Sequence, residues 1–255
     1  MNKTLLITLA ALALVGCTAK TNPTDSRLKQ NIAPRCNAYD SSFVRITDVI
    51  PDAILEIRYY STYNFVGARI DGYEVPMALM TRQAADSLRV VSDELLAQGY
   101  RIKIWDAYRP QRAVNHFIRW AENLQDTAMK QVFYPMVDKS LLFEQGYIYA
   151  KSSHSRGSTV DLTLVDAASG KELDMGSPFD WFGEESHPDY KGEGLKGKGE
   201  RLKGKGERDD WQANRQILWD AMLRHGFTMI DSEWWHFTLA DEPFPDTYFD
   251  FPISW

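Results

Sequence analysis

Apolar and polar residues follow two different periods along the chain. Residues 99–106 alternate between the two kinds, as in a strand with one buried face. In residues 81–98 apolar side chains recur at helical spacing behind Thr81, a suitable N-cap. Residues 112–123 and about 211–225 have the same helical character. The pattern alone therefore predicts a mixed fold of helices and strands.

Three shorter segments complete this pattern. Residues 43–49 and the apolar run 160–164 have the composition of strands. Residues 59–65 are rich in aromatic side chains and turn-like. Because Tyr and Phe contribute much of the area of protein cores, the pattern alone assigns these aromatic residues to the core.

Composition narrows the class of protein. With 255 residues, of which 44% are hydrophobic and 25% charged, the chain fits one globular domain with a substantial core. The net charge is −6, and the sequence pattern predicts no face with a concentration of Lys and Arg. Phosphate backbones are bound mainly by Lys and Arg, so nucleic acid is not an expected partner. A small substrate, or one with a cationic end, suits this charge better.

The first residues have the pattern of an export signal. A charged start with Lys3 precedes an apolar stretch, residues 5–15, that is too short to span a membrane. Residues 14–17, Leu-Val-Gly-Cys, resemble the lipobox of bacterial lipoproteins, in which the cysteine is acylated and begins the mature chain. We therefore expect Cys17 to be a lipidation site. The alternative is an ordinary cleaved signal with an accidental cysteine.

This interpretation divides the chain into three parts. Residues 1–16 are the expected lipoprotein signal peptide, residues 17–38 a polar tether and residues 39–255 the folded domain. The protein is then an exported bacterial lipoprotein, anchored to a membrane on the periplasmic or cell-surface side. Cys36 is the only other cysteine, so the domain is expected to have no internal disulfide.

A tandem duplication interrupts the domain. Residues 195–201 are repeated at once as residues 202–208. The repeat is rich in Gly and charged side chains, so we expect a mobile surface insertion at about residues 191–208. The alternative is a basic arm that contacts wall polymer or anionic lipid, but the acidic residues of the repeat offset part of its positive charge.

Two compact motifs carry the chemistry of the chain. His154 and Asp161 stand in the run Ser-Ser-His-Ser-Arg-Gly-Ser-Thr-Val-Asp, and Glu233 and His236 stand in Glu-Trp-Trp-His-Phe. Imidazole and carboxylate groups suit zinc, and a catalytic zinc site has three protein ligands and one open position. His154, Asp161 and His236 are the candidate ligands. Gly157 between the first two allows a tight turn that brings them to one ion.

Two further residues complete a hydrolytic site. Glu233 is left free to act as a general base on a zinc-bound water. Arg109 follows the alternating segment 99–106, and the next residue, Pro110, disfavours helical geometry at Arg109. A fixed guanidinium at this point can stabilise the oxyanion of amide hydrolysis, and Asp106 can orient it.

These motifs resemble the zinc-dependent D-alanyl-D-alanine dipeptidases, whose wider relatives include D,D-carboxypeptidases and the hedgehog signalling domain. The resemblance covers about residues 44–237 and includes Asp-Ala-Tyr-Arg-Pro at 106–110. It implies that His154, Asp161 and His236 bind zinc. It also implies that Glu233 is the catalytic base and that Arg109 stabilises the transition state.

The resemblance also implies a fold and a substrate pocket. The fold is α+β, with helices packed on a small antiparallel sheet whose central strands hold Asp161 and His236 at a zinc-centred cleft. Asp180 would bind the free amino end of the dipeptide, Ser152 would contact the substrate through its hydroxyl, and Tyr59 would border the pocket. For Asp180 a structural helix cap remains an alternative.

The expected reaction is hydrolysis of D-Ala-D-Ala to two D-Ala, with one Zn²⁺ per chain. A D,D-carboxypeptidase or endopeptidase that acts on peptidoglycan stem peptides would use the same zinc group and remains an alternative. A non-catalytic, zinc-binding lipoprotein is the other alternative, although the presence of both Glu233 and Arg109 argues against it. Other divalent ions would also accept this ligand set. His187 has no assigned role.

Overall fold

The computed structural model describes residues 42–192, 194–196, 200–201 and 208–254. The expected signal peptide and tether, with Cys17 and Cys36, lie outside the described residues, as does most of the duplicated segment. In the described part of the chain, no helix combines the length and apolar character needed to cross a membrane.

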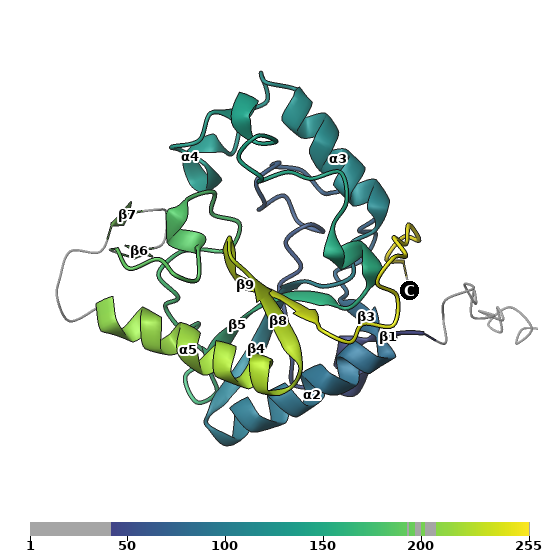
Figure 1. The fold of residues 1–255 in the computed structure, drawn as a ribbon, viewed down its shortest axis with the longest axis vertical. Coiled ribbons are helices and arrows are strands. Elements are labelled where there is room, and N and C mark those ends of the chain that lie inside the picture. The colour runs from purple at the N-terminus through teal and green to yellow at the C-terminus, as the bar shows by residue number, and fades with distance from the viewer. Residues whose placement is uncertain (1–41, 193, 197–199, 202–207, 255) are drawn as a thin grey trace, which may run out of the picture. The chain divides into compact units, whose positions relative to one another are not determined.

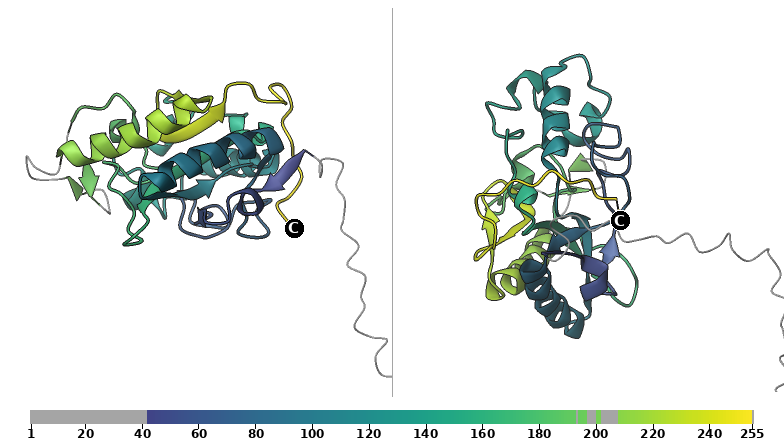
Figure 2. Two further views of the ribbon diagram at one scale, coloured as in Figure 1. Left: turned by 90° about the horizontal axis from the view of Figure 1, so that it is seen from below. Right: turned by 90° about the vertical axis from the view of Figure 1, so that its right-hand side faces the viewer.

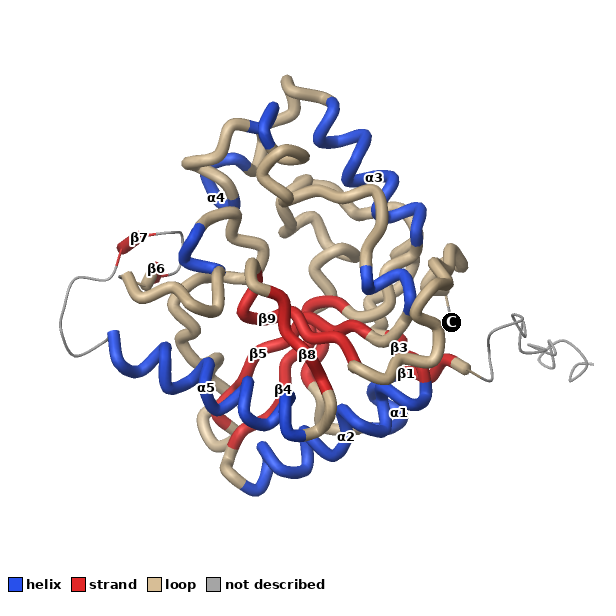
Figure 3. The backbone as a smooth tube through the Cα atoms, in the orientation of Figure 1, coloured by secondary structure: helices blue, strands red, loops and turns tan. Residues whose placement is uncertain are grey.

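A five-stranded sheet forms the centre of the domain (Figure 3). Its strands, in spatial order, are β2 (Ile54–Leu55), β4 (Tyr100–Asp106), β5 (Thr159–Asp166), β9 (Glu233–Leu239) and β8 (Phe227–Ile230). The short edge strand β2 is parallel to β4, and all other neighbours are antiparallel. Strand β5 is buried along almost its whole length, because it has neighbours on both edges and its two faces are covered.

Two helices pack on the sheet, and two lie beyond it. The helices α2 (Arg82–Ala97) and α5 (Arg208–Arg224) contact each other, and α2 packs on β4 while α5 packs on β8. In Figures 1 and 2, α3 (Gln111–Glu122) and α4 (Lys130–Phe133) lie on the other side of the strands. The predicted α+β class, with helices packed on a small antiparallel sheet, is confirmed.

The predicted helix over residues 81–98 forms as α2. The side chain of Thr81 accepts a hydrogen bond from the backbone N–H of Ala84 and so caps the helix. Ala84, Leu88, Val91 and Leu95 are fully buried, which gives α2 one apolar face at helical spacing. The remaining short helices are η1 (Lys139–Leu141), η2 (Ser153–Arg156) and η3 (Glu184–Ser186).

The predicted strand over residues 43–49 is only half correct. Strand β1 (Phe43–Arg45) pairs antiparallel with β3 (Leu79–Thr81), but the chain then turns into the short helix α1 (Ile46–Val49). The N–H of Ile46 still donates to the carbonyl of Ala78, at 3.0 Å. The carbonyl of Ile46 instead accepts from the N–H of Ile50, at 2.7 Å, so it belongs to the helix and not to the ladder.

The start of the expected surface insertion is anchored to the domain. Strands β6 (Leu195–Lys196) and β7 (Glu200–Arg201) pair antiparallel. The side chain of Leu195 is 3% exposed, and its N–H donates to the carbonyl of Gly176. Leu195 is therefore buried, in contrast to the prediction of a surface insertion over this segment.

Candidate active site

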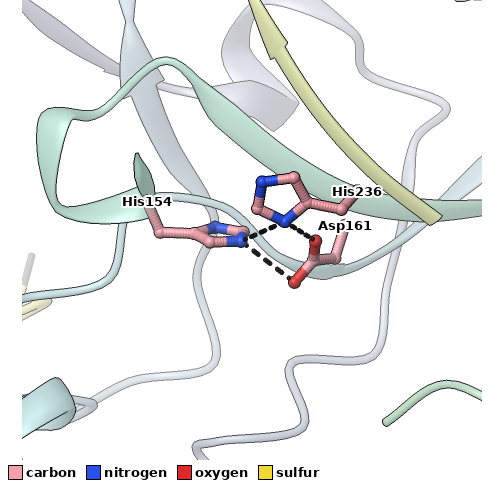
Figure 4. A group of neighbouring side chains, drawn as sticks. All are labelled: His154, Asp161 and His236. Carbon is pink, nitrogen blue, oxygen red and sulfur yellow. Dashed lines mark hydrogen bonds and ion pairs between the residues drawn. The ribbon is translucent and has the colours of Figure 1, made fainter. Parts of the chain in front are cut away.

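Three predicted ligands converge in the centre of the sheet (Figure 4). Asp161 on β5 and His236 on β9 are directly opposite each other in the strand register, and His154 comes from η2. The distances are 3.2 Å from His154 Nε2 to His236 Nδ1, 3.2 Å from His154 Nε2 to Asp161 Oδ2 and 3.2 Å from His236 Nδ1 to Asp161 Oδ1. Hydrogen-bonded strand pairing thus brings together residues that lie far apart in sequence.

The geometry of this cluster fits a divalent metal ion. Zinc binds imidazole nitrogen and carboxylate oxygen at about 2.0–2.2 Å, so tetrahedral ligand atoms lie roughly 3.4 Å apart. The three observed separations of 3.2 Å are close to this value. Asp161 Oδ1 is buried and, in the described part of the chain, has no hydrogen-bond donor. A cation between the three side chains would satisfy it.

The outer nitrogens of both imidazoles are held by hydrogen bonds. His154 Nδ1–H donates to the carbonyl of Ala107 at 2.7 Å. The lone pair of Nε2 is then available to bind a metal ion. His236 Nε2 lies 3.0 Å from Ser153 Oγ, which can accept its hydrogen bond when Nδ1 is a metal ligand. Ser153 had no assigned role in the sequence, and only its place beside the first ligand could have suggested one.

The pKa values of Asp161 and Glu233 are shifted in opposite directions. Burial alone would raise the pKa of Asp161, but the neighbouring His154 and His236 outweigh burial and lower it. Burial raises the pKa of Glu233, and the negative charge of Asp161 adds to the rise. The Glu233 side chain is 38% exposed, at the wall of a cavity. Opposite pKa shifts are expected when one carboxylate, Asp161, is a metal ligand and its neighbour, Glu233, accepts a proton.

An irregular strand pairing places Glu233 beside the ligand cluster. Residues three apart on a regular strand face opposite sides, so Glu233 would point away from His236. The register of β8 and β9 shifts where Ile230 pairs with Glu233. This irregularity re-aims the side chain, and Glu233 Oε2 lies 3.5 Å from His236 Nδ1.

Arg109 is fixed by two carboxylates. Its Nε donates to Asp106 Oδ2 at 2.9 Å, and its Nη2 lies 3.5 Å from Asp161 Oδ2. Asp106 is directly opposite Asp161 in the register, and its other oxygen accepts a hydrogen bond of 2.6 Å from the hydroxyl of Tyr73. The predicted pairing of Asp106 with Arg109 is confirmed, whereas the Tyr73 contact had no sequence signal.

A cavity of about 190 Å³ adjoins the ligand cluster. The predicted substrate contacts Tyr59, Ser152 and Asp180 all line it, together with Arg109, Lys151 and Glu233. Sites for drug-sized ligands usually measure roughly 300–1,000 Å³, so this cavity suits a small ligand. Tyr59 is also 1% exposed and packs on surrounding aromatic rings, so it belongs to the core as well as to the cavity wall.

Asp180 is a strained and buried carboxylate. Its backbone has φ +60°, in the left-handed region that non-glycine residues rarely adopt. Oδ1 accepts a hydrogen bond from the hydroxyl of Tyr59 at 3.1 Å, whereas Oδ2 has no partner among the residues that the structure describes. Burial raises the pKa of Asp180 well above its usual value. The alternative of a helix cap is wrong, because η3 begins after Gly183.

Arg215 holds the loop that carries Asp180. This guanidinium on α5 is fully buried and donates to three carbonyls of the loop, those of Met175 at 2.6 Å, Glu185 at 2.7 Å and His187 at 3.0 Å. Arg215 had no assigned role in the sequence. A signal was present, because Arg215 occupies an apolar stripe of α5 with Trp211, Leu218 and Met222.

The turn between the first two ligands depends on Gly157. Its φ is +85°, and an added Cβ would collide with the ring of Phe43 and come within 3.2 Å of Thr81. Phe43 is itself packed edge-on against Tyr108 and Phe249, with both centroid distances 5.2 Å, and cannot move aside.

We therefore expect Gly157→Ala to lower the free energy of unfolding by roughly 1–3 kcal/mol more than Gly170→Ala. Gly170 is the matched control, because it also has positive φ, +71°, but no atom within 4 Å of its added Cβ. Denaturant unfolding of both variants measures the difference. Equal losses would show that steric contact at Gly157 contributes nothing.

Comparison with known proteins agrees with this geometry. A sequence profile described as D-Ala-D-Ala dipeptidase matches residues 40–254. The chain belongs to the D-Ala-D-Ala dipeptidase family. The D-alanyl-D-alanine dipeptidase of Enterococcus faecalis is 37% identical over 215 residues, which are 84% of this chain and 100% of the relative. The one from Streptomyces coelicolor is 35% identical over 212 residues, which are 83% and 98%.

A more distant member of the D-Ala-D-Ala dipeptidase family, from Escherichia coli, is 29% identical over 199 residues, 78% of this chain and 85% of the relative. The family match includes every residue assigned to the ligand cluster and the cavity, whereas Cys17 precedes it. Members of this family are peptidases that act with a bound metal, in agreement with the three converging ligands.

Proposed function

We propose that this protein hydrolyses D-Ala-D-Ala to two molecules of D-Ala with the help of one bound zinc ion. The observation that carries the proposal is the position of Asp180. It is a buried carboxylate with an unpartnered oxygen, in a small cavity whose wall also contains the ligand cluster and Glu233. The dipeptidases of E. faecalis and S. coelicolor support the same substrate.

His154, Asp161 and His236 would hold the zinc. When bound there, zinc acts as a Lewis acid that polarises the peptide carbonyl and lowers the pKa of water. Glu233 accepts a proton from the attacking water and returns it to the leaving amine, which its raised pKa favours. The N–H groups of Arg109 stabilise the oxyanion, because Asp106 holds the guanidinium fixed at 2.9 Å.

Asp180 and Tyr59 bind the amino end of the substrate. The ammonium group would donate to the free Oδ2 of Asp180, while Oδ1 keeps its hydrogen bond from Tyr59. A nearby positive charge favours the ionised form of a carboxyl group, so substrate binding lowers the pKa that burial has raised. Recognition of a free amino group selects a dipeptide over a longer chain.

We expect Asp180→Asn to reduce kcat/KM for D-Ala-D-Ala by roughly 10- to 100-fold, because a hydrogen bond to a charged group contributes about 1.5–3 kcal/mol. For lactoyl-D-Ala, which has a hydroxyl in place of the amino group, Asp180→Asn should reduce kcat/KM far less. The exposed Asp241→Asn is the matched control and should behave as wild type. An equal loss with both substrates would argue against ammonium recognition.

The length of the substrate is tested by direct comparison. The full-length protein with zinc is incubated with D-Ala-D-Ala and with a stem pentapeptide ending in D-Ala-D-Ala, and released D-Ala is measured. The small cavity favours the dipeptide. Cleavage of the pentapeptide alone would make the protein a D,D-carboxypeptidase instead.

We also propose that the protein is a membrane-anchored lipoprotein, with residues 1–16 removed, Cys17 acylated, residues 17–38 as a tether and residues 39–255 as the peptidase domain. The support is the lipobox-like sequence at residues 14–17. Cells grown with an alkyne-labelled fatty acid should label the wild type and Cys36→Ser but not Cys17→Ser. Labelling of Cys17→Ser would contradict the assignment.

A further inference from the structure

We infer that Lys151 binds the carboxylate of the substrate's C-terminal residue and so makes the enzyme an exopeptidase. The inference rests on the proposed function and adds the second half of substrate recognition. A free D,D-dipeptide carries an ammonium group at one end and a carboxylate at the other. Asp180 accounts for the first charge, and the second requires a cation that is available for binding.

Two basic side chains outside the ligand cluster line the described cavity, Arg109 and Lys151. Arg109 is already paired, since its Nε lies 2.9 Å from Asp106 and its Nη2 lies 3.5 Å from Asp161. Its place beside the metal ligands suits the oxyanion rather than the substrate's terminus. Lys151 is therefore the cation that remains for the carboxylate.

The ammonium group of Lys151 is uncommitted. Its Nζ lies 4.6 Å from the ring centroid of Tyr248 and forms no ion pair with any carboxylate among the described residues. A cation–π contact at an exposed site is weak, and it leaves N–H donors free. Lys151 can thus bind an incoming carboxylate without first breaking a salt bridge.

The backbone on both sides of Lys151 is fixed. The carbonyl of Ala150 accepts a hydrogen bond of 3.0 Å from Gln111 Nε2 on α3. Ser152 caps η2 by accepting from the N–H of His154, at 3.3 Å. The side chain of Lys151 therefore starts from a backbone that is tied to the first metal ligand, three residues later.

The two charged ends of an extended dipeptide lie about 7 Å apart. Asp180 and Lys151 both line the cavity but have different neighbours: Asp180 is hydrogen-bonded to Tyr59, and Lys151 contacts Tyr248, which is not among the lining residues. A stem peptide also ends in a free carboxylate, so Lys151 would serve either substrate length. An endopeptidase would have no carboxylate at this position.

The test compares D-Ala-D-Ala with its C-terminal amide, using full-length protein with zinc. We expect wild type to prefer the free acid by about tenfold in kcat/KM, as for a partly exposed charge pair. Lys151→Met should lose this preference, mainly through a higher KM for the acid. Lys151→Arg should retain it. Lys171→Met, an exposed lysine outside the cavity, is the matched control and should match wild type.

Unchanged preference for the acid in an active Lys151→Met variant would overturn this inference alone. Equal hydrolysis of acid and amide by wild type would overturn it as well, while leaving the proposed peptidase reaction in place. Absence of hydrolysis of both compounds by wild type would instead overturn the proposed function, and the role of Lys151 with it.

Discussion

Removal of the metal with a chelator is expected to abolish hydrolysis of D-Ala-D-Ala, by at least about 10³-fold, because a catalytic metal contributes several kcal/mol of transition-state stabilisation. The protein should also unfold at a lower temperature. His154 Nε2 and His236 Nδ1 lie 3.2 Å apart, and Asp161 Oδ1 is a buried acceptor without a hydrogen-bond donor among the described residues. A bound cation would satisfy these groups and stabilise the folded state by mass action.

Re-addition of ions gives the control. Zn²⁺ and Co²⁺ should restore both activity and thermal stability, because both accept imidazole and carboxylate ligands. Mg²⁺ prefers oxygen ligands in an octahedral arrangement and should restore neither. Full activity in protein whose metal content has been measured as negligible would contradict the assignment of His154, Asp161 and His236 as ligands.

Substitution of Glu233 by Gln is expected to lower kcat by roughly 10²–10⁴-fold, the usual contribution of a general base. The amide has nearly the same size as the carboxylate but cannot accept the proton of the attacking water. Glu233 is not one of the three converging ligands, so one metal per chain should still bind. Steady-state kinetics and metal analysis of the same preparation measure both effects.

The exposed Glu74→Gln is a suitable control and should keep wild-type kcat. If Glu233→Gln retained a tenth or more of the wild-type kcat together with its metal, another group would have to act as the base. If the variant lost its metal, Glu233 would be a ligand rather than a proton acceptor. Either result would revise the proposed division of roles among the acidic residues.

The side chains of Tyr73, Asp106, Arg109 and Asp161 form one connected network. Asp106 accepts from Tyr73 at 2.6 Å and from Arg109 at 2.9 Å, and Arg109 reaches Asp161. The same carboxylate that orients the guanidinium lies opposite a metal ligand in the strand register. Strand pairing therefore aligns the oxyanion stabiliser with the metal centre.

Local pattern was enough to predict the long elements. The apolar face of α2 and the cap at Thr81 are both properties of neighbouring residues, so residues 81–98 could be assigned from sequence. Residues 43–49 could not, because the strand pairs only as far as Arg45 opposite Leu79, in a segment that is distant in sequence. Likewise, the burial of Leu195 depends on a contact with Gly176 rather than on its own charged surroundings.

The site also contains residues that could be predicted from local sequence and residues that could not. His154, Asp161 and His236 could be proposed as a set because compact motifs carry them. Tyr73 could not, because it acts through a hydrogen bond to a distant segment. Ser153 beside the first ligand and Arg215 on an apolar stripe had a local signal, but their hydrogen-bond partners lie far away in the sequence. The cap alternative for Asp180 was excluded only once the start of η3 was known.

The measurement that tests the central claim most directly is release of D-alanine from D-Ala-D-Ala by the full-length protein carrying one zinc per chain. Two D-Ala should form for each dipeptide consumed, and L-Ala-L-Ala should be cleaved more slowly. Absence of released D-alanine, although zinc is bound and the protein is folded, would contradict the peptidase assignment and favour a non-catalytic zinc-binding lipoprotein.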